Sequence, residues 1–299
     1  MNYKEIYLEG ARRLENVGIA EAELDARLLL EFVCGTDRNT LLVHPERAVA
    51  EEQYKDYVNL IERRMEHNPI QYLMGKQEFM GLQFYVNPNV LIPRQDTEIL
   101  VEEVMPHVHD GMKIWDVCTG SGCIVISLLQ YSNDCAGLGT DISKNALEVA
   151  VKNARDILEQ KGMCVLEEEG ELTAGTVRFC CGDLLDAFSG TEKFDIIVSN
   201  PPYIPTEVIA TLEPEVAKKE PILALDGKED GLFFYRKITA SAGKYLTRGG
   251  KLFFEIGYDQ GEAVSGLLAD AGFVEIEVKK DYAGLDRVVF GTWLEEKDV

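Results

Sequence analysis

The segment Asn200-Pro201-Pro202-Tyr203 combines residue types that can hold a planar amino group, and it directly follows the apolar run Phe194–Ser199. Two successive prolines fix φ and remove two backbone N–H donors, so the carbonyl groups of this loop can face a ligand. An –NH₂ group can donate one hydrogen to the Asn200 side-chain oxygen and the other to the Pro201 carbonyl, while Tyr203 packs on its face. The four residues are therefore predicted to form a catalytic clamp that orients a weakly nucleophilic nitrogen.

A second segment predicts a nucleoside site. A predicted strand ends near Asp116, and the turn of small residues Cys118-Thr119-Gly120-Ser121-Gly122 leads from it into an apolar helix. Such a turn places backbone N–H groups at a helix N-terminus against a ligand. Asp141 ends the next predicted strand, where its carboxylate can accept both hydroxyls of a ribose. Asp183 follows a third strand and is predicted to contact the adenine side; the alternative is a solvated acid in a loop.

The form of this turn narrows the choice of cofactor. It lacks the G-x-G-x-x-G spacing of dinucleotide enzymes. Its sequence is closer to the first motif of S-adenosylmethionine-dependent methyltransferases. The alternative is that the glycines only close a tight turn between a strand and a helix.

The elements that must position these residues predict an α/β fold. From Lys113 onward, short apolar strands alternate with helical stretches, which predicts a Rossmann-like, mainly parallel sheet of seven strands covered on both faces. The last two strands, Phe273–Val278 and Arg287–Thr292, are too close in sequence for a crossover helix, so we expect an antiparallel hairpin at the sheet edge. Residues 160–176, with Glu167-Glu168-Glu169 and two glycines, are interpreted as a solvated loop insertion.

Three regions are predicted along the chain. In residues 1–75, apolar side chains recur at spacings of three and four and predict a small all-α helical bundle. In residues 76–92 the apolar side chains recur at a shorter spacing, which is interrupted by Gly81 and by Asn87-Pro88-Asn89. This pattern indicates a β-hairpin or extended connector. Residues 93–299 carry both chemical segments and form the predicted α/β domain.

Composition disfavours several classes of protein. The chain has 299 residues, 46% of them hydrophobic, and a formal net charge of −22. That charge would repel nucleic acid and anionic membranes. No apolar run reaches the roughly 18 residues of a membrane span, and no signal peptide opens the chain. We expect a cytoplasmic monomer without direct nucleic-acid or membrane binding.

The seven cysteines and four histidines lack metal-ligand spacing, so we expect reduced, mostly buried thiols and no metal.

Nearly the whole chain resembles the HemK family of protein-(glutamine-N5) methyltransferases, also called release factor glutamine methyltransferases. The tetrapeptide Asn200–Tyr203 is shared with methyltransferases of exocyclic amines in nucleic acids, but the helical leader and the Ile-Pro-Arg segment are not. The other matching segments include Pro69-Ile70-Gln71-Tyr72-Leu73, Leu91-Ile92-Pro93-Arg94-Gln95-Asp96-Thr97-Glu98, Glu213-Pro214, Glu220-Pro221, Glu255-Ile256-Gly257 and Asp281-Tyr282-Ala283-Gly284.

The resemblance implies methyl transfer from S-adenosyl-L-methionine to the side-chain amide of the glutamine in the Gly-Gly-Gln motif of class 1 peptide chain release factors. S-adenosyl-L-homocysteine would be the product. The resemblance also implies that the helical region 1–75 helps to grip the factor, and that residues 93–299 form the methyltransferase domain. Carried onto this sequence, the cofactor-binding residues would be Arg94, Cys118, Thr119, Gly120, Ser121, Gly122, Asp141, Asp183, Leu184 and Asn200.

Two positions depart from the family pattern. Cys118 stands where the family usually has the first glycine of the turn, and a positive φ there would cost about 1 kcal/mol or more. Such strain in the turn would affect the affinity for the cofactor. Gln95 replaces the usual proline after Ile-Pro-Arg and is expected only to loosen the loop.

Two other functions remain open from the sequence. A methyltransferase of adenine or guanine amino groups in RNA or DNA would share the clamp and the cofactor, although the net charge of −22 disfavours it. A non-catalytic nucleotide-binding or adaptor module, with a decayed turn at Cys118, is the alternative from another class of protein.

Overall fold

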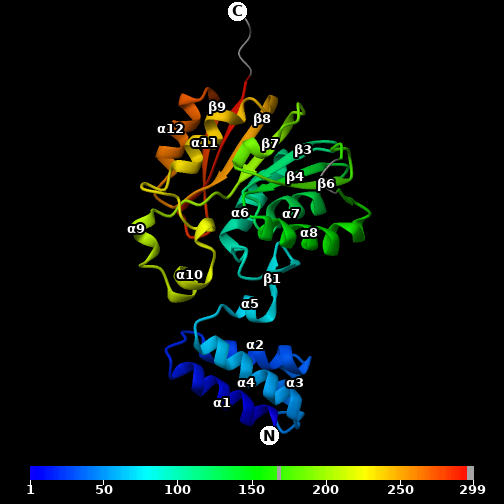
Figure 1. The fold of residues 1–299 in the computed structure, drawn as a ribbon, viewed down its shortest axis with the longest axis vertical. Helices are drawn as coiled ribbons and strands as arrows, with labels where there is room; N and C mark the ends of the chain where they lie inside the picture. Colours follow the sequence, from blue (N-terminus) through cyan, green and yellow to red (C-terminus); the bar gives the residue numbers. More distant parts are fainter. Residues whose placement is uncertain (167–169, 295–299) are drawn as a thin grey trace, which may run out of the picture. The chain divides into compact units, whose positions relative to one another are not determined.

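The computed structural model describes residues 1–166 and 170–294, and Figure 1 shows the ribbon. The chain divides into two compact units. The helical unit contains Met1–Lys76 and Glu213–Lys219, and the α/β unit contains Gln77–Leu212 and the chain from Glu220 onward. Within the described ranges, no helix is long and apolar enough to cross a membrane. The same ranges contain no cluster of three or more His, Cys, Asp or Glu side chains suited to a metal ion.

The helical unit encloses its own apolar core. Its first helix begins with a capping box, in which Glu5 N donates to Asn2 Oδ1 at 2.9 Å and Asn2 N donates to Glu5 Oε2 at 3.0 Å. Leu14, Leu29 and Tyr57 meet in the buried core. The helices are α1 (Tyr3–Glu15), α2 (Ala22–Cys34), α3 (Arg38–Val43), α4 (Glu51–Met65), α5 (Ile70–Met74) and α10 (Pro214–Lys219).

A short hairpin precedes the main sheet. Strands β1 (Lys76–Phe79) and β2 (Leu82–Tyr85) pair with each other. The intervening Met80 and Gly81 both have positive φ, as a tight two-residue turn requires. Asn153 holds the end of this hairpin, because its Oδ1 accepts from Tyr85 N at 2.7 Å and its Nδ2 donates to Tyr85 O at 3.0 Å.

The main sheet contains eight strands within the described residues, in the order β5-β6-β4-β3-β7-β8-β10-β9. Strand β10 is antiparallel to both β8 and β9, and the other neighbours are parallel. The strands are β3 (Lys113–Val117), β4 (Ala136–Asp141), β5 (Cys164–Leu166), β6 (Thr176–Cys181), β7 (Phe194–Ser199), β8 (Leu246–Glu255), β9 (Phe273–Lys280) and β10 (Asp286–Trp293).

Helices cover both faces of this sheet, so its central strands are buried on both sides. One apolar cluster joins the sheet to α6 (Gln95–Val104), α7 (Cys123–Tyr131) and α8 (Lys144–Leu158). A second cluster joins the opposite face to α11 (Phe233–Ala242) and α12 (Gly261–Asp270). The short helix α9 (Thr206–Ile209) lies in the connection after β7. The predicted α/β class and mainly parallel sheet are confirmed.

The prediction of seven strands is wrong by one, because residues 160–176 are not simply a loop. They contain the edge strand β5, in which Cys164, Val165 and Leu166 pair with Thr176, Val177 and Arg178 of β6. A three-residue strand is too short to show a hydrophobic period, and only its pairing partner stabilises it. The acidic run Glu167-Glu168-Glu169 lies outside the described residues.

The cysteines are all free, but the expectation of mostly buried thiols is wrong. Cys123 and Cys135 are buried, whereas Cys164 and Cys181 are exposed. Cys164 begins the edge strand β5, and Cys181 is the last residue of β6.

A buried ion pair ties the helical unit together. The Arg64 side chain on α4 donates from Nε to Asp25 Oδ2 of α2 at 2.7 Å, and its Nη1 lies 2.9 Å from Glu215 Oε2 of α10. Burial raises the pKa of Asp25, although the bond from Arg64 opposes the shift. Removal of the arginine would leave a buried carboxylate without its counter-charge, which is more costly than the loss of an exposed pair.

We expect Arg64→Ala to lower the free energy of unfolding of the helical unit by about 3 kcal/mol. Arg13→Ala is the matched control, since its 3.1 Å pair with Glu62 is largely exposed and should contribute less than about 1 kcal/mol. Hydrogen exchange of α2 and α4 amides in the full chain measures both values. The loss for Arg64→Ala should shrink as the pH falls toward the pKa of Asp25, because protonation removes the unpaired charge. Equal losses for the two variants would contradict this account.

Candidate functional site

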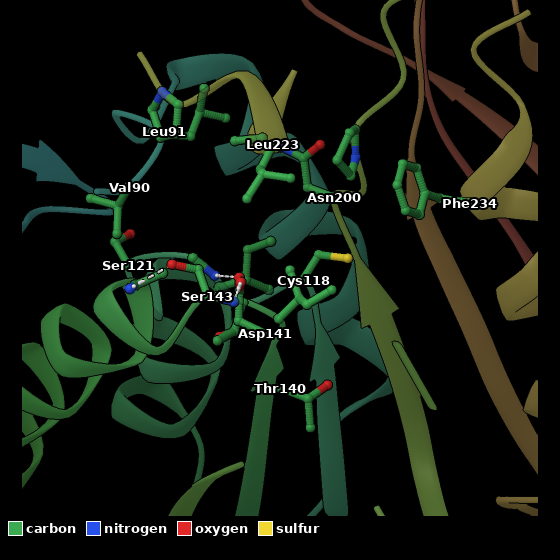
Figure 2. Close-up of a pocket in the computed structure, with 18 of the residues that line it drawn as sticks. Val90, Leu91, Cys118, Ser121, Thr140, Asp141, Ser143, Asn200, Leu223 and Phe234 are labelled. Carbon is green, nitrogen blue, oxygen red and sulfur yellow. Dashed lines mark hydrogen bonds between the residues drawn. The ribbon is translucent and has the colours of Figure 1, made fainter. Parts of the chain in front are cut away.

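A cavity of about 310 Å³ opens at the carboxyl ends of the parallel strands (Figure 2). The chain runs from β3 through β4 to β6 on one side and then returns to β7 on the other side of β3. Loops after β3 and β7 therefore diverge, which is where open α/β sheets bind ligands. The lining comes from the loops after β3, β4, β6 and β7, from residues 89–97, and from residues 221–237.

The turn after β3 has the backbone geometry of an anion or nucleoside cradle. Gly120 and Gly122 both have positive φ, and Gly122 is the residue that caps α7. A Cβ on Gly122 would lie 2.7 Å from Ile126 Cδ1 and 3.3 Å from Ala150 Cβ, so the close packing of α7 and α8 requires glycine there. The turn is also fixed to β4, because Thr119 N donates to Thr140 O at 2.9 Å.

Asp141 links this turn to the loop after β4. Its Oδ2 accepts from Gly120 N at 3.0 Å and its Oδ1 accepts from Ser143 N at 2.9 Å. Burial raises the pKa of Asp141, although these backbone bonds oppose the shift. Each carboxylate oxygen has a second lone pair, so Asp141 can still accept two hydroxyl groups from the cavity side. This donor and acceptor set fits the ribose of a nucleoside.

Asp116 supports the turn from below, and its side chain is fully buried. Its Oδ2 accepts from Thr119 Oγ1 at 2.6 Å and from Val125 N at 3.4 Å. Oδ1 is buried and has no hydrogen-bond partner among the described residues. Burial raises the pKa of Asp116 to about 7, against the bonds from Thr119 and Val125.

Cys118 occupies a backbone conformation that favours glycine. Its φ is +63°, so the departure from the family pattern does place a side chain in a strained position. The thiol lines the cavity (Figure 2). Burial raises the pKa of this thiol, and the charges of Asp141 and Asp116 raise it further, so the sulfur remains protonated.

Asn200 lies directly after β7 and lines the same cavity, across from Asp141 in Figure 2. Its Nδ2 donates to Thr97 Oγ1 at 3.2 Å. Pro202 also lines the cavity. Pro201 and Tyr203 are not part of the lining; Tyr203 packs against the core, and its carbonyl accepts from Gln260 Nε2 at 3.1 Å.

The remaining predicted cofactor residues lie at the rim, and two of them have ionic partners. Arg94 donates to Glu220, whose carboxyl is buried, and Glu220 Oε2 also accepts from Ile92 N at 3.4 Å. Asp183 lies 3.3 Å from Lys237 Nζ on α11. The predicted residues that line the cavity are Arg94, Cys118, Thr119, Gly120, Ser121, Asp141, Asp183, Leu184, Asn200 and Pro202, whereas Gly122 acts behind the lining through helix packing.

Sequence reasoning missed part of this site. Leu223 and Phe234 contribute apolar walls from the segment after Glu220, and Thr97 contributes a buried hydroxyl from α6. Glu255 at the end of β8 lies just behind Asn200 and Thr97. No local spacing relates these residues to the turn after β3. The available signals were that Thr97 and Glu255 lie in segments that resemble the family and that Glu255 ends a strand.

Known proteins that resemble this chain are methyltransferases, as the cavity at the strand ends suggests. Two family models match the chain, a PrmC N-terminal domain over residues 5–75 and a methyltransferase small domain over residues 94–213. A release factor glutamine methyltransferase from Clostridium acetobutylicum is 43% identical over 269 residues, covering 89% of each chain. A protein with the same description from Agrobacterium fabrum is 38% identical over 285 residues, covering 93% of each chain.

A solved methyltransferase structure from Pyrococcus furiosus has a similar fold. It aligns with a TM-score of 0.50 at 16% identity, over 77% of this chain and 96% of its own. The identity to the two relatives extends over nearly the whole chain. It therefore assigns the family, whereas the fold alone would not. The resemblance seen in the sequence is thereby confirmed, and the chain belongs to the release factor glutamine methyltransferase family.

Proposed function

We propose that this protein transfers a methyl group from S-adenosyl-L-methionine to the side-chain amide nitrogen of the glutamine in the Gly-Gly-Gln motif of a class 1 peptide chain release factor. The observation that carries the proposal is the presence of Asn200 and Asp141 in one cavity, with the glycine turn between β3 and α7 beside them. The names of the relatives supply the class of substrate.

The residues around the turn fit the proposed cofactor. Asp141 would accept the ribose hydroxyls, and the glycine turn would hold the amino-acid end through its backbone. Asp183 and Leu184 would contact the adenine. When bound, S-adenosyl-L-methionine supplies a methyl group attached to a positively charged sulfur. The acidic side chains of Asp116 and Asp141 make this end of the cavity suitable for a cation.

The clamp would act on the glutamine amide. Asn200 Oδ1 accepts one N–H of that amide, and the carbonyl of Pro201 is the proposed acceptor for the other. In such a transfer the nitrogen lone pair would form the new bond to the methyl carbon, the electron pair of the carbon–sulfur bond would remain on sulfur, and one N–H proton would leave to water. The contacts of Pro201 and Tyr203 with the substrate stay predictions, because neither residue lines the cavity.

The helical unit is the proposed second contact with the release factor. A single amide side chain buries too little area for a stable complex, since specific interfaces bury about 1,200–2,000 Å². Residues 1–75 offer an additional folded surface, whose apolar hollow is bordered by the exposed Leu8 and Leu42. A monomer and a cytoplasmic location remain part of the proposal. The net charge of −22 favours a protein substrate over naked RNA or DNA.

The central experiment is incubation with labelled methyl donor, followed by mass spectrometry. Three substrates are compared: a release factor, the same factor with its Gly-Gly-Gln glutamine replaced by alanine, and total RNA. We expect one methyl group on the first substrate only. Efficient labelling of RNA would move the amino-group methyltransferase of nucleic acids into first place. Saturable cofactor binding without transfer to any substrate would favour a binding module.

Asp141→Ala should weaken cofactor binding by about 1.5–3 kcal/mol, because hydrogen bonds to a charged group are lost. Isothermal titration calorimetry measures this change. Asp156→Ala is the matched control, since Asp156 is exposed on α8, where it pairs with Lys152 at 2.7 Å. Cys118→Gly should bind cofactor as well as the parent or better, because glycine relieves the positive φ. A large loss of affinity in Cys118→Gly would instead mean that the thiol contacts the cofactor.

Asn200→Ala should lower kcat roughly 100-fold, because the lost hydrogen bond acts as charge develops on the amide. The cofactor Kd should change far less, which distinguishes a role in transfer from a role in binding. Asn133→Ala, at an exposed position before β4, serves as the control. Near-parental turnover by Asn200→Ala at saturating cofactor would rule out the clamp.

A further inference from the structure

Glu255 is a buried acid that the proposed transfer does not yet use. It ends β8, and its side chain is only 2% exposed. Ser199 pairs with Phe254 in the parallel ladder between β7 and β8, so the next residues along the two strands are Asn200 and Glu255. Glu255 also pairs with Val288 of β10. The carboxyl group is therefore enclosed beside the clamp, behind the cavity wall.

Two hydrogen-bonding side chains separate this carboxyl from the cavity. Asn200 Nδ2 donates to Thr97 Oγ1 at 3.2 Å, and Thr97 is 3% exposed in the first turn of α6. Hydrogen bonds from Thr97 and Asn200 favour the charged form of Glu255. Oε2 of Glu255 is buried and has no hydrogen-bond partner among the described residues. Hydrogen bonds from Thr97 and Asn200 therefore link the acid to the clamp, and the charge of Arg287 also acts on it.

We propose that Glu255 is a positioning residue, whose ionised carboxyl accepts hydrogen bonds from Thr97 and Asn200 and thereby keeps Asn200 Oδ1 turned toward the substrate amide. This inference rests on the proposed function. An ionised carboxyl can only accept. The Thr97 hydroxyl then directs its single proton to Glu255, so its oxygen must accept from Asn200, and the amide is held by its nitrogen end.

Protonation of Glu255 reverses this chain. A neutral carboxyl can donate its proton to Thr97 Oγ1, which frees the Thr97 hydroxyl to donate toward Asn200. Asn200 would then be held by its oxygen and would present Nδ2 to the cavity. Two N–H donors would face each other, and the substrate amide would lose its acceptor. The reacting orientation is thus coupled to one proton on Glu255.

The surroundings of Glu255 allow both protonation states near neutral pH. Burial raises the pKa of Glu255 to about 7, while Thr97 and the charge of Arg287 oppose the shift. Arg287 is itself shared, with Nη2 at 3.2 Å from Asp96 Oδ2 and 3.1 Å from Asp281 Oδ2. The titratable groups that face Glu255 from neighbouring elements are Arg287, Asp96, Cys123, Tyr203 and Tyr235.

The ionisation of Glu255 sets the direction in which the rate of methyl transfer changes with pH. Cys123, Tyr203 and Tyr235 have raised pKa values and stay neutral through this range. Glu255 gains its charge as the pH rises through about 7, so the rate of methyl transfer should rise with it. Asp116 also has a pKa of about 7, but it supports the cofactor turn. Saturating cofactor removes any effect of Asp116 on cofactor binding, and the variant Asp116→Asn tests whether Asp116 affects the transfer step.

The test measures the single-turnover rate of methyl transfer to a Gly-Gly-Gln peptide between pH 5.5 and 8.5, approximate limits that extend about 1.5 units on either side of the expected pKa. The cofactor Kd is measured for every variant as a check of folding. The parent should show a rising step near neutral pH. Glu255→Gln should lose the step and fall at least about tenfold at high pH, since an amide can both donate and accept.

Thr97 supplies a second and independent pair of variants. Thr97→Val removes the hydroxyl at nearly constant shape and should behave as Glu255→Gln does, whereas Thr97→Ser should keep both the rate and the step. Thr239→Val is the matched control, because Thr239 is 4% exposed on α11 and its Oγ1 has no hydrogen-bond partner in the described ranges. Its pH profile should equal that of the parent.

Several outcomes would overturn the inference. It fails if Glu255→Gln keeps the step, if Thr97→Val keeps the parental rate and profile, or if Asp116→Asn alone abolishes the step at saturating cofactor. Failure of the proposed function gives a different result, because the parent itself would then methylate neither the peptide nor the intact release factor. A parent that is active with a flat profile would refute the role of Glu255 and leave the proposed function intact.

Discussion

The parallel pairing of β3 with β7 is the interaction on which the site depends. Val117 is the register partner of Ser199, and Ser199 Oγ donates to Val117 O at 2.5 Å at the last pair of the ladder. Because both strands end at the same level, the turn that begins at Cys118 and the clamp that begins at Asn200 leave the sheet side by side. A slip of the register would move each strand-end residue relative to the other and would separate the proposed cofactor turn from the proposed substrate clamp.

Carboxyl groups surround this junction, and each has a different environment. Asp141 accepts backbone N–H groups at the cavity wall, Asp116 lies beneath the turn, and Glu255 lies behind the clamp. Burial disfavours the charge of all three, so the enclosed region is stabilised when a cation enters or a proton is taken up. This is compatible with a positively charged methyl donor, and it places neighbouring pKa values in the neutral range rather than far below it.

The sequence allowed the sheet class to be predicted, and it indicated that the turn after β3 and Asn200 lie near each other, because each follows an apolar strand and strand ends converge in a parallel sheet. The edge strand β5 was missed, since three residues carry no period and depend on their partner β6. The contributions of Thr97 and Glu255 were missed for another reason. They meet Asn200 only after α6, β7 and β8 have packed, and nothing in the local spacing of residues 97, 200 and 255 records that contact.

The shape of the Asn200 side chain explains why its contact with Thr97 and Glu255 is needed. The two ends of an asparagine amide have nearly the same size, so packing around Asn200 cannot decide whether oxygen or nitrogen faces the cavity. A hydroxyl partner alone cannot decide it either, because Thr97 Oγ1 can accept from one end or donate to the other. Only a group that is restricted to one of these roles gives the chain a direction. An ionised carboxyl that accepts from both residues has that property, and a buried position with a pKa near 7 makes the direction depend on pH. Correct orientation of the clamp is therefore a matter of charge at Glu255 as much as of the backbone that carries Asn200.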